Sequence, residues 1–426
     1  MSKYFTLFKR VCITFTVIVM LNSCDFKDQQ VKGAKMVFSG YDGEIKNNKI
    51  PVIIKNKHKV FNVRIPQVIS DTSSMRLDNL VRNIQYIQLE TERNSLIGSV
   101  DKLIVTDKSI IVCDFDKASS IFIFNLKGKF INKIFLKGKG PGEFLAVRDV
   151  TYNNETNEIL LYDDFGRKIN YYSEDGSFIK SSKTYYYYLK LAWLEDGSLL
   201  SKATPDINLH IPDLKYAQLV STDTSQSILT KAFNTKPVFE KNELNSSKNF
   251  KDHSGKVLFT PLFTDTIFEI SSATGMFAKY HIDMGDRNIV KRVTTDIDAS
   301  SFLLELNLKK NYYFEGNCLE AKDNLFFELN NGNLASFFYS SKTGRLVGGK
   351  STNSTDIDLA LFSFPKGVYK DSYVSTISAT EIIGRRNGMD HSLISKLKNN
   401  KTIKLINSIK QEDNPVLMFY NIDEKF

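Results

Sequence analysis

The stretch "DKLIVTDKSIIVCDFDKASSIFIFNLKGKFINKIF", Asp101–Phe135, contains four short apolar runs separated by polar turns. A second stretch, "RDVTYNNETNEILLYDDFGRKINYYSEDGSFIKSSK" (Arg148–Lys183), repeats the same order of runs and turns. In both, the second run ends in aspartate and a glycine turn precedes the last run, so Gly128 and Gly176 fall at matching positions. Repeated units of four short strands are typical of the blades of a β-propeller.

Such a four-stranded sheet is not expected to be stable alone, because its faces and its edge strands would stay exposed to water. Stacking the sheets around an axis buries their faces, and strands buried on both faces should be almost continuously apolar. The runs "SIFIF" and "EILLY" meet this demand. Weaker units of the same kind follow over 184–233, 256–285, 316–349 and 359–378. We therefore predict an all-β, six-bladed β-propeller.

The two ends of the predicted propeller are expected to meet in one blade. Arg82–Glu90 reads as a strand before the first full blade, and the sixth unit is short of a strand even with Asn414–Ile422 added. We predict that these two segments pair and close the ring without a covalent link. Three insertions are expected: a polar surface loop over Asn234–Gly255 and short helices over Asp298–Tyr313 and Met389–Asn400.

The N-terminus has the layout of a secretory signal. Lys3, Lys9 and Arg10 precede an apolar run, Val11–Leu21, which is shorter than the roughly 20 residues that span a bilayer. The "LNSC" that follows resembles the lipobox of bacterial lipoproteins, in which the cysteine is acylated and becomes the new N-terminus. An ordinary signal peptide that ends near a cysteine is the alternative, but the order of these features favours Cys24 as the lipid attachment point.

These features divide the chain into a signal peptide (1–23), a tether with an N-terminal segment (24–76) and the propeller (77–426). The formal net charge is +9, and the lysines are scattered rather than grouped, which indicates solubility and not nucleic-acid binding. We expect a monomer in the cell envelope, held by its lipid to the outer membrane, with the face of that membrane left open.

The glycine-rich stretch "KGKGPGEF" (137–144) raises the alternative of a phosphate-binding loop. A P-loop requires Gly-x-x-x-x-Gly-Lys-Ser/Thr before a helix, and no serine or threonine follows a lysine here. The stretch lies between the last strand of one predicted blade and the first strand of the next. Its glycines and Pro141 therefore indicate a tight turn between blades.

Several of these stretches carry a family resemblance. "YIQLE", "SLIGSVDKLIV", "IFIFNLKGKF", "GKGPGEF" and the closing "EDNPVLMFY" resemble the six-bladed β-propeller lipoproteins of Gram-negative anaerobes, distant relatives of NHL-repeat and TolB-like propellers. The resemblance covers about residues 77–424. It implies an envelope lipoprotein found with nutrient-uptake systems, and it supplies no catalytic residues.

Candidate ligand-binding residues are found in a run of aromatic residues and beside two short stretches that contain arginine. In the run Tyr185–Tyr188, alternate rings point to opposite faces of a strand, so two can pack between blades while the others stay free to stack on a sugar or a partner. Packing between blades is the competing interpretation. Arg148 and Asp149, just after the glycine turn, could approach the channel, and the two arginines of "GRRNG" could bind an anion. The candidates are Arg148, Asp149, Tyr186, Tyr188, Trp193, Arg385 and Arg386.

Other polar residues favour structural roles. Asp114 and Asp163 end the second strand of two successive units, and a repeated position of this kind favours the capping of turns over calcium binding. Cys113 and Cys318 lie in apolar strands, which favours buried free thiols over a disulfide. No two histidines stand at a metal-ligand spacing. We therefore predict no metal site and no catalytic residues.

The leading hypothesis is a non-enzymatic, lipid-anchored propeller that binds a ligand or a partner, such as a glycan, a peptide or an envelope protein, in nutrient acquisition. It needs no cofactor. The alternative is a propeller lyase or hydrolase that acts on a glycan or a peptide with calcium or zinc in the central channel. A scaffold within an envelope complex is a third hypothesis.

Overall fold

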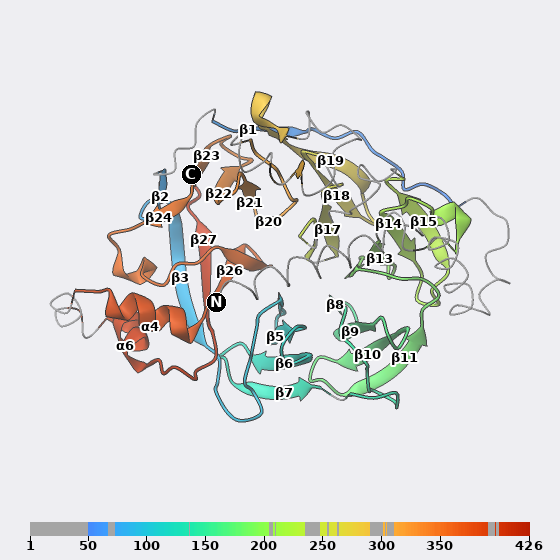
Figure 1. Cartoon of the computed structure of the whole chain (residues 1–426), viewed down its shortest axis with the longest axis horizontal. Coiled ribbons are helices and arrows are strands. Elements are labelled where there is room, and N and C mark those ends of the chain that lie inside the picture. Colours follow the sequence, from blue (N-terminus) through green and yellow to red (C-terminus); the bar gives the residue numbers. More distant parts are fainter. Residues whose placement is uncertain are drawn as a thin grey trace, which may run out of the picture.

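The computed structural model is a six-bladed β-propeller, which confirms the predicted fold (Figure 1). The structure describes residues 50–426 except 67–72, 136, 204–207, 209, 235–247, 254, 262–263, 290–300, 303, 305–310, 391–396 and 398–399. The predicted signal peptide, Cys24 and the first part of the tether lie outside the described residues. So do most of the two insertions that were predicted to be helical.

In blades 1 to 3, four consecutive strands run from the central axis outward. Blade 1 contains β4 (Lys102–Val105), β5 (Ser109–Asp114), β6 (Ser120–Asn125) and β7 (Phe130–Ile134). Blade 2 contains β8 (Asp149–Asn153), β9 (Glu158–Asp163), β10 (Lys168–Ser173) and β11 (Phe178–Lys183). Blade 3 contains β12 (Lys190–Trp193), β13 (Leu199–Lys202), β14 (Leu219–Thr222) and β15 (Ile228–Ala232).

The second half of the ring follows the same plan. Blade 4 contains β16 (Phe250–His253), β17 (Lys256–Phe259), β18 (Thr266–Ser271) and β19 (Gly275–Asp283). Blade 5 contains β20 (Cys318–Ala321), β21 (Asn324–Asn330), β22 (Leu334–Ser340) and β23 (Leu346–Gly349). Blade 6 contains β25 (Pro365–Tyr369), β26 (Ser372–Ile377), β27 (Val416–Ile422) and, as its outer strand, β3 (Val81–Gln88).

The ring closes as the sequence predicts. β3 pairs antiparallel with β27, with Val416 opposite Gln88 and Ile422 opposite Val81. Asn414, just before β27, donates from its amide nitrogen to the carbonyl oxygens of Glu90 and Ser95 at 2.7 and 2.8 Å. Both ends of the propeller are therefore held in one sheet.

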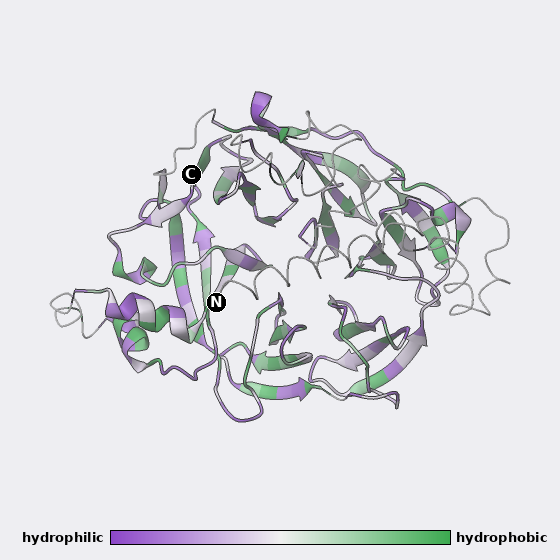
Figure 2. Ribbon diagram, in the orientation of Figure 1, coloured by the Kyte–Doolittle hydropathy of each residue, from purple (hydrophilic) through white to green (hydrophobic). Residues whose placement is uncertain are grey.

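Apolar layers between neighbouring blades hold the ring together. All six residues of β5 are buried, and Ile111, Ile123, Leu161 and Tyr172 belong to one apolar cluster between blades 1 and 2. Burial of such side chains contributes about 25 cal/mol for each Å² of apolar surface. Cys113 and Cys318 are buried free thiols, as predicted. The outer strands β3, β7 and β11 mix polar and apolar residues (Figure 2).

The segment before β3 runs along the outer edges of blades 3 to 5 (Figure 1). The amide of Ile53 donates to the carbonyl oxygen of Lys231 at 3.0 Å. β1 (Phe61–Arg64) then pairs in parallel with β19, and β2 (Ser74–Arg76) pairs in parallel with β24 (Ser351–Asn353). These contacts satisfy edge strands that would otherwise be open to pairing with other chains.

Asp114 ties the loop before blade 1 to the turn after β5. One carboxylate oxygen accepts from the amides of Gly98 and Ser99, each at 2.8 Å, and the other accepts from those of Lys117 and Ala118 at 2.9 and 2.8 Å. Burial alone would raise the pKa of Asp114, but these amides outweigh burial and hold the pKa below its ordinary value. The predicted turn-capping role is thus confirmed.

Asp163 has the same capping role in blade 2 as Asp114 has in blade 1. Its carboxylate accepts from the amides of Leu145, Ala146 and Gly166 at 2.8, 3.1 and 2.8 Å. The repeated aspartate therefore joins the start of each blade to its second turn.

Asp114→Ala is expected to lower the free energy of unfolding by about 2 kcal/mol, because several buried amides lose their acceptor. Asp116→Ala, an exposed change in the same turn, should alter it by less than about 0.5 kcal/mol. Urea unfolding followed by circular dichroism measures both. Since the pKa of Asp114 is lowered, its contribution should be present at neutral pH and be lost as the pH falls below 3.8 through the folded-state pKa. Equal effects of the two substitutions would contradict the capping role.

The glycine-rich stretch forms the predicted tight turn between blades 1 and 2. The amide of Gly138 donates to the carbonyl oxygen of Phe144 at 3.0 Å, and the amide of Gly140 donates to Glu143 at 2.8 Å. Gly142 has a φ of +71°, a conformation that side chains with a Cβ rarely adopt. Two carbonyl groups of the stretch also accept from β10, since Tyr172 donates to Gly142 at 2.9 Å and Asn170 donates to Glu143 at 3.0 Å.

One predicted insertion differs from the structure. The expected surface loop over Asn234–Gly255 is wrong at its end, since Phe250–His253 form β16, the innermost strand of blade 4. Most of the helix predicted over Met389–Asn400 lies outside the described residues, with α4 (Ala379–Asn387) before it and α6 (Lys401–Ser408) after it. Asn400 is the N-cap of α6, since its side chain accepts from the amides of Thr402 and Ile403.

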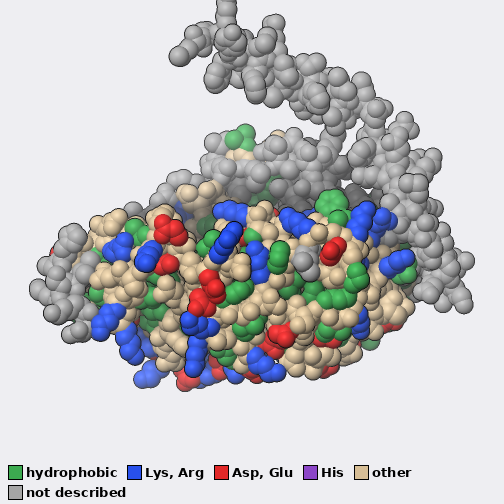
Figure 3. Space-filling view, turned by 90° about the horizontal axis from the view of Figure 1, so that it is seen from below, with side chains coloured by type: hydrophobic (Ala, Val, Ile, Leu, Met, Phe, Trp, Pro, Cys, Tyr) green, Lys and Arg blue, Asp and Glu red, His purple; other side chains and the backbone are tan. Residues whose placement is uncertain are grey.

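Charges of both signs are interspersed over the rim that faces the viewer in Figure 3. This matches the scattered lysines of the sequence. Mixed surface charge of this kind favours solubility.

Candidate functional site

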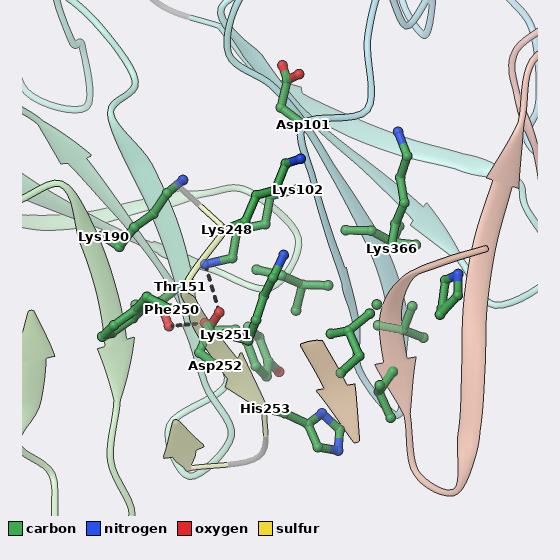
Figure 4. A pocket seen from close by; sticks show the side chains of 18 of the residues that line it. Asp101, Lys102, Thr151, Lys190, Lys248, Phe250, Lys251, Asp252, His253 and Lys366 are labelled. Atoms are coloured by element: carbon green, nitrogen blue, oxygen red, sulfur yellow. Dashed lines mark hydrogen bonds and ion pairs between the residues drawn. The ribbon is translucent and has the colours of Figure 1, made fainter. Parts of the chain in front are cut away.

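The six innermost strands surround a cavity of about 420 Å³ on the axis of the ring. Inner strands of different blades supply its walls, and several of their lysines reach toward its centre (Figure 4). The acidic, basic and histidine residues that line it are Asp101, Lys102, Lys190, Lys248, Lys251, Asp252, His253, Glu328 and Lys366. We call this space the channel cavity.

Lys102 links three blades on one side of the channel cavity. Its ammonium nitrogen lies 3.0 Å from a carboxylate oxygen of Asp252 in blade 4 and 3.5 Å from one of Asp149 in blade 2. Thr151 also donates to Asp252, at 3.1 Å. Burial would lower the pKa of Lys102, but Asp149 and Asp252 outweigh it and raise the pKa above its ordinary value. Lys102 is therefore a fully compensated cation.

Asp149 is fully buried behind the cavity wall. Besides Lys102, it faces the ammonium nitrogen of Lys190 at 3.4 Å and accepts from the amide of Leu191 at 2.8 Å. It thus holds the innermost strands of blades 1, 2 and 3 together and positions two lysines of the cavity.

The charge of Lys251, unlike that of Lys102, is not balanced by an ion pair with a described carboxylate. Among the described residues, no carboxylate lies within ion-pair distance of its ammonium group. Burial lowers the pKa of Lys251 from its ordinary 10.5 to about 8, and the nearby Lys190 and Lys102 add to this shift. The fold therefore carries a positive charge on β16 that it does not neutralise itself.

This arrangement predicts that Lys251→Met stabilises the protein. At neutral pH the gain in free energy of unfolding should be about 2 kcal/mol, below the full value of the pKa shift because the side chain faces the cavity. From pH 8 to 10.5 the wild-type lysine is neutral when folded but still charged when unfolded, so the wild-type gains stability and the difference vanishes. Urea unfolding at pH 7 and pH 10 measures this, with the exposed Lys183→Met as the control. A loss of stability on removing Lys251 would contradict the assignment.

A smaller cavity of about 380 Å³ adjoins the first, since Asp101 and Lys190 line both. Phe115, Arg148 and Lys202 contribute to its walls. Burial lowers the pKa of Lys202 to about 7, and Lys190 adds to the shift. The basic character of the channel cavity therefore continues toward the loops between blades 1, 2 and 3.

The structure places the predicted aromatic candidates in two different environments. Tyr186 and Tyr188 are buried and pack edge to face against each other, with ring centroids 4.5 Å apart. The ring of Tyr188 also contacts that of Tyr162 in blade 2. Their placement is that of the competing interpretation, packing between blades. Trp193, in contrast, lines the channel cavity.

The basic candidates also divide into two groups. Arg148 lies at the wall of the smaller cavity and pairs with Asp164 through two nitrogens, at 2.7 and 2.6 Å. Arg385 and Arg386 lie on α4, outside the ring. Arg385 donates to the carbonyl oxygens of Ala360 and Phe362, and Arg386 donates to those of two residues in and after α6. The structure does not bring them to the channel cavity.

Sequence reasoning missed the residues of β16, including Lys251, Asp252 and His253, because they follow a long polar segment. A signal was present. The fourth unit as read from Lys256 has only three strands, and "NFKDH" before the "SG" turn supplies the innermost strand.

Within the described ranges, no group of three or more histidine, cysteine, aspartate or glutamate side chains is arranged to hold a metal ion. His253 lines the cavity, and burial lowers its pKa below the ordinary value. No helix in the described part of the chain has the length and apolar character that crossing a membrane requires.

Comparison with solved structures found a neighbour that shares the fold, and weaker likenesses to others. A candidate exported protein of Bacteroides fragilis NCTC 9343 superposes with a TM-score of 0.64 at 19% identity, over 86% of this chain and 100% of that chain. A member of the DUF4221 family from Bacteroides vulgatus ATCC 8482 gives 0.46 at 11% identity, over 81% and 97%. A virginiamycin B lyase from Staphylococcus aureus gives 0.36 at 12% identity, over 68% and 81%.

No curated protein matches this chain by sequence. A family model described as "Domain of unknown function (DUF4934)" matches residues 60–421. The match begins just before β1 and ends within β27, so it spans all six blades. The chain therefore belongs to the DUF4934 family.

Proposed function

We propose that this protein is an exported, lipid-anchored propeller of the cell envelope that binds a small ligand in its channel cavity without transforming it. The observation that carries the proposal is the cavity itself. It lies on the axis, has a volume of about 420 Å³, and is lined by polar side chains from different blades. Binding sites of this size commonly combine a few placed polar groups with apolar walls, as Trp193 and Phe250 provide here.

Export and lipidation are supported by the "LNSC" motif and by the likeness to lipoprotein propellers stated above. The fold neighbour from Bacteroides fragilis, described as a candidate exported protein, points the same way. Such a location suits nutrient acquisition, with a glycan or a peptide as the ligand. The relation to NHL-repeat and TolB-like propellers belongs to the same proposal.

Cys24→Ser is expected to abolish acylation and to move the protein from the membrane to the soluble fraction. Metabolic labelling with an alkyne-palmitate, followed by membrane fractionation of producing cells, measures both. Cys113→Ser is the matched control, because that thiol is buried and should leave labelling unchanged. Continued labelling of the Cys24→Ser protein would contradict the lipid anchor.

Ligand binding is tested by calorimetry with oligosaccharides and peptides on purified protein. A binding role without catalysis predicts that the ligand is recovered unchanged after prolonged incubation. It also predicts that elemental analysis finds no stoichiometric calcium or zinc. A cleaved ligand or a stoichiometric metal would favour the alternative, a metal-dependent lyase or hydrolase.

A further inference from the structure

We propose that the channel cavity recognises the carboxylate of a small anionic ligand, with Lys251 as the main cation and Lys190 and Lys366 beside it. This inference rests on the proposed function, because it names the chemistry of the ligand for the same cavity. The three lysines come from the innermost strands of blades 4, 3 and 6 and all line the cavity (Figure 4).

Lys251 is the residue that points to an anion. It stands on the innermost strand of blade 4, beside two other lysines, and no described carboxylate pairs with it. A cation withdrawn from water without a partner is unfavourable, so its presence in a cavity indicates a partner supplied from outside.

The carboxylates of the cavity wall are already engaged and do not neutralise Lys251. Asp252 accepts from Thr151 and pairs with Lys102. Glu328, on blade 5, accepts from Asn317 and Ser336. These groups keep their partners when the cavity is empty, so the charge on Lys251 remains available to a ligand.

The same cluster shows which anion its lysines accommodate. Lys102 and Lys190 hold the carboxylate of Asp149 at 3.5 and 3.4 Å, and Lys102 holds that of Asp252 at 3.0 Å. A ligand carboxylate beside Lys251 would extend this alternation of charge. Trp193 lines the same cavity and offers an aromatic wall to the rest of the ligand. An acidic sugar and a peptide C-terminus both provide this chemistry.

Two matched pairs of probes separate these sources. Trigalacturonate is compared with its methyl ester, and N-acetyl-trialanine with a free C-terminus is compared with its C-terminal amide. Calorimetry at pH 7 and low salt measures the dissociation constants. We expect at least one acid to bind at least tenfold more tightly than its neutral counterpart, and the pair that shows this identifies the source.

Variants of Lys251 test its role in binding the carboxylate. Lys251→Met should weaken binding of the acid at least tenfold, and Lys251→Arg should stay within about threefold of the wild-type because it keeps the charge. Lys183→Met, an exposed change on the outer strand of blade 2, removes the same charge away from the cavity and should have no effect. The melting temperature of Lys251→Met should be equal to or above that of the wild-type, which separates lost binding from lost folding.

The pH dependence gives an independent readout. The groups that face Lys251 are Cys318 on β20, Lys190 on β12, Lys102 on β4 and Asp252 on its own strand. Because its pKa is about 8, about a tenth of Lys251 is protonated at pH 9, and affinity should be about tenfold lower there than at pH 7. The Lys251→Arg protein should keep its affinity at pH 9.

The possible results test carboxylate recognition and the proposed function separately. Equal binding of acids and neutral counterparts, or full affinity in Lys251→Met, overturns carboxylate recognition and leaves the cavity as a binding site. If none of the four probes binds, carboxylate recognition is wrong. If neutral oligosaccharides and peptides also fail to bind, the proposed function is wrong as well.

Discussion

Leu417→Asp is expected to leave the protein without a stable fold at 25 °C. Leu417 is fully buried on β27, in the apolar cluster that joins blade 6 to blade 1. A buried, unpaired carboxylate there should cost more than about 4 kcal/mol, a large part of the stability of a typical domain. Gln85→Asp is the matched control, because this residue of β3 is exposed in the same strand pair, and it should cost less than about 1 kcal/mol.

The chain offers a way to tell whether the damage is confined to blade 6. Trp193 is the only tryptophan and belongs to blade 3, on the opposite side of the ring. If closure holds the whole ring, Trp193 fluorescence and far-UV circular dichroism should be lost together in Leu417→Asp. Native tryptophan fluorescence in a partly unfolded chain would show that the blades fold independently, as in open repeat arrays.

Asp149→Ala is expected to lower the free energy of unfolding by about 4 kcal/mol, because it leaves Lys102 and Lys190 partly buried without their shared carboxylate. The control is Asp164→Ala in the same blade. Asp164 pairs with Arg148, whose side chain is 47% exposed, so this ion pair should contribute less than about 1 kcal/mol. Urea unfolding at pH 7 measures both losses.

A double substitution tests the cause of the Asp149→Ala effect. Among the described residues Lys190 pairs with Asp149, whereas Lys102 also pairs with Asp252. Lys190→Met in the Asp149→Ala background therefore removes the charge that has lost its ion-pair partner. It should recover about 1 to 2 kcal/mol, a coupling in the range seen for residues in direct contact. Strictly additive losses would show that Asp149 acts through the amide of Leu191 and not through the lysines.

The contrast between Lys102 and Lys251 links stability to function. Lys102 is compensated by two carboxylates, and its removal should destabilise the fold. Lys251 has none within ion-pair distance among the described residues, and its removal should stabilise the fold while weakening carboxylate binding at least tenfold. Opposite signs for two lysines of one cavity distinguish a structural cation from one kept for a ligand.

Sequence reasoning succeeded where a feature depends on neighbours in the chain. The repeat of Asp114 and Asp163, the glycine turn over 137–144 and the apolar strands of blades 1 and 2 are local patterns, and each has the predicted structure. Ring closure between 82–90 and 414–422 was also predictable, because an unmatched strand at each end leaves few ways to complete six blades.

Sequence reasoning failed where an inner strand contains polar residues. β16 was read as part of a loop because Lys251, Asp252 and His253 interrupt the apolar pattern that marks the other strands. An inner strand faces the cavity and not only its neighbouring blades, so polar residues are tolerated there. In the tyrosine run, Tyr186 and Tyr188 are the two rings that pack between blades, a choice between alternate residues that the sequence left open.

The strands of blades 1 and 2, the capped turns and the strand pair that closes the ring follow from the sequence by itself, because each depends on short-range periodicity or on the count of strands. Which lysines meet, which of them find carboxylates and which one is left for a ligand were decided only by the tertiary structure. Lys102, Lys190, Lys251 and Lys366 belong to four blades, and only the closed ring brings them to the wall of one cavity.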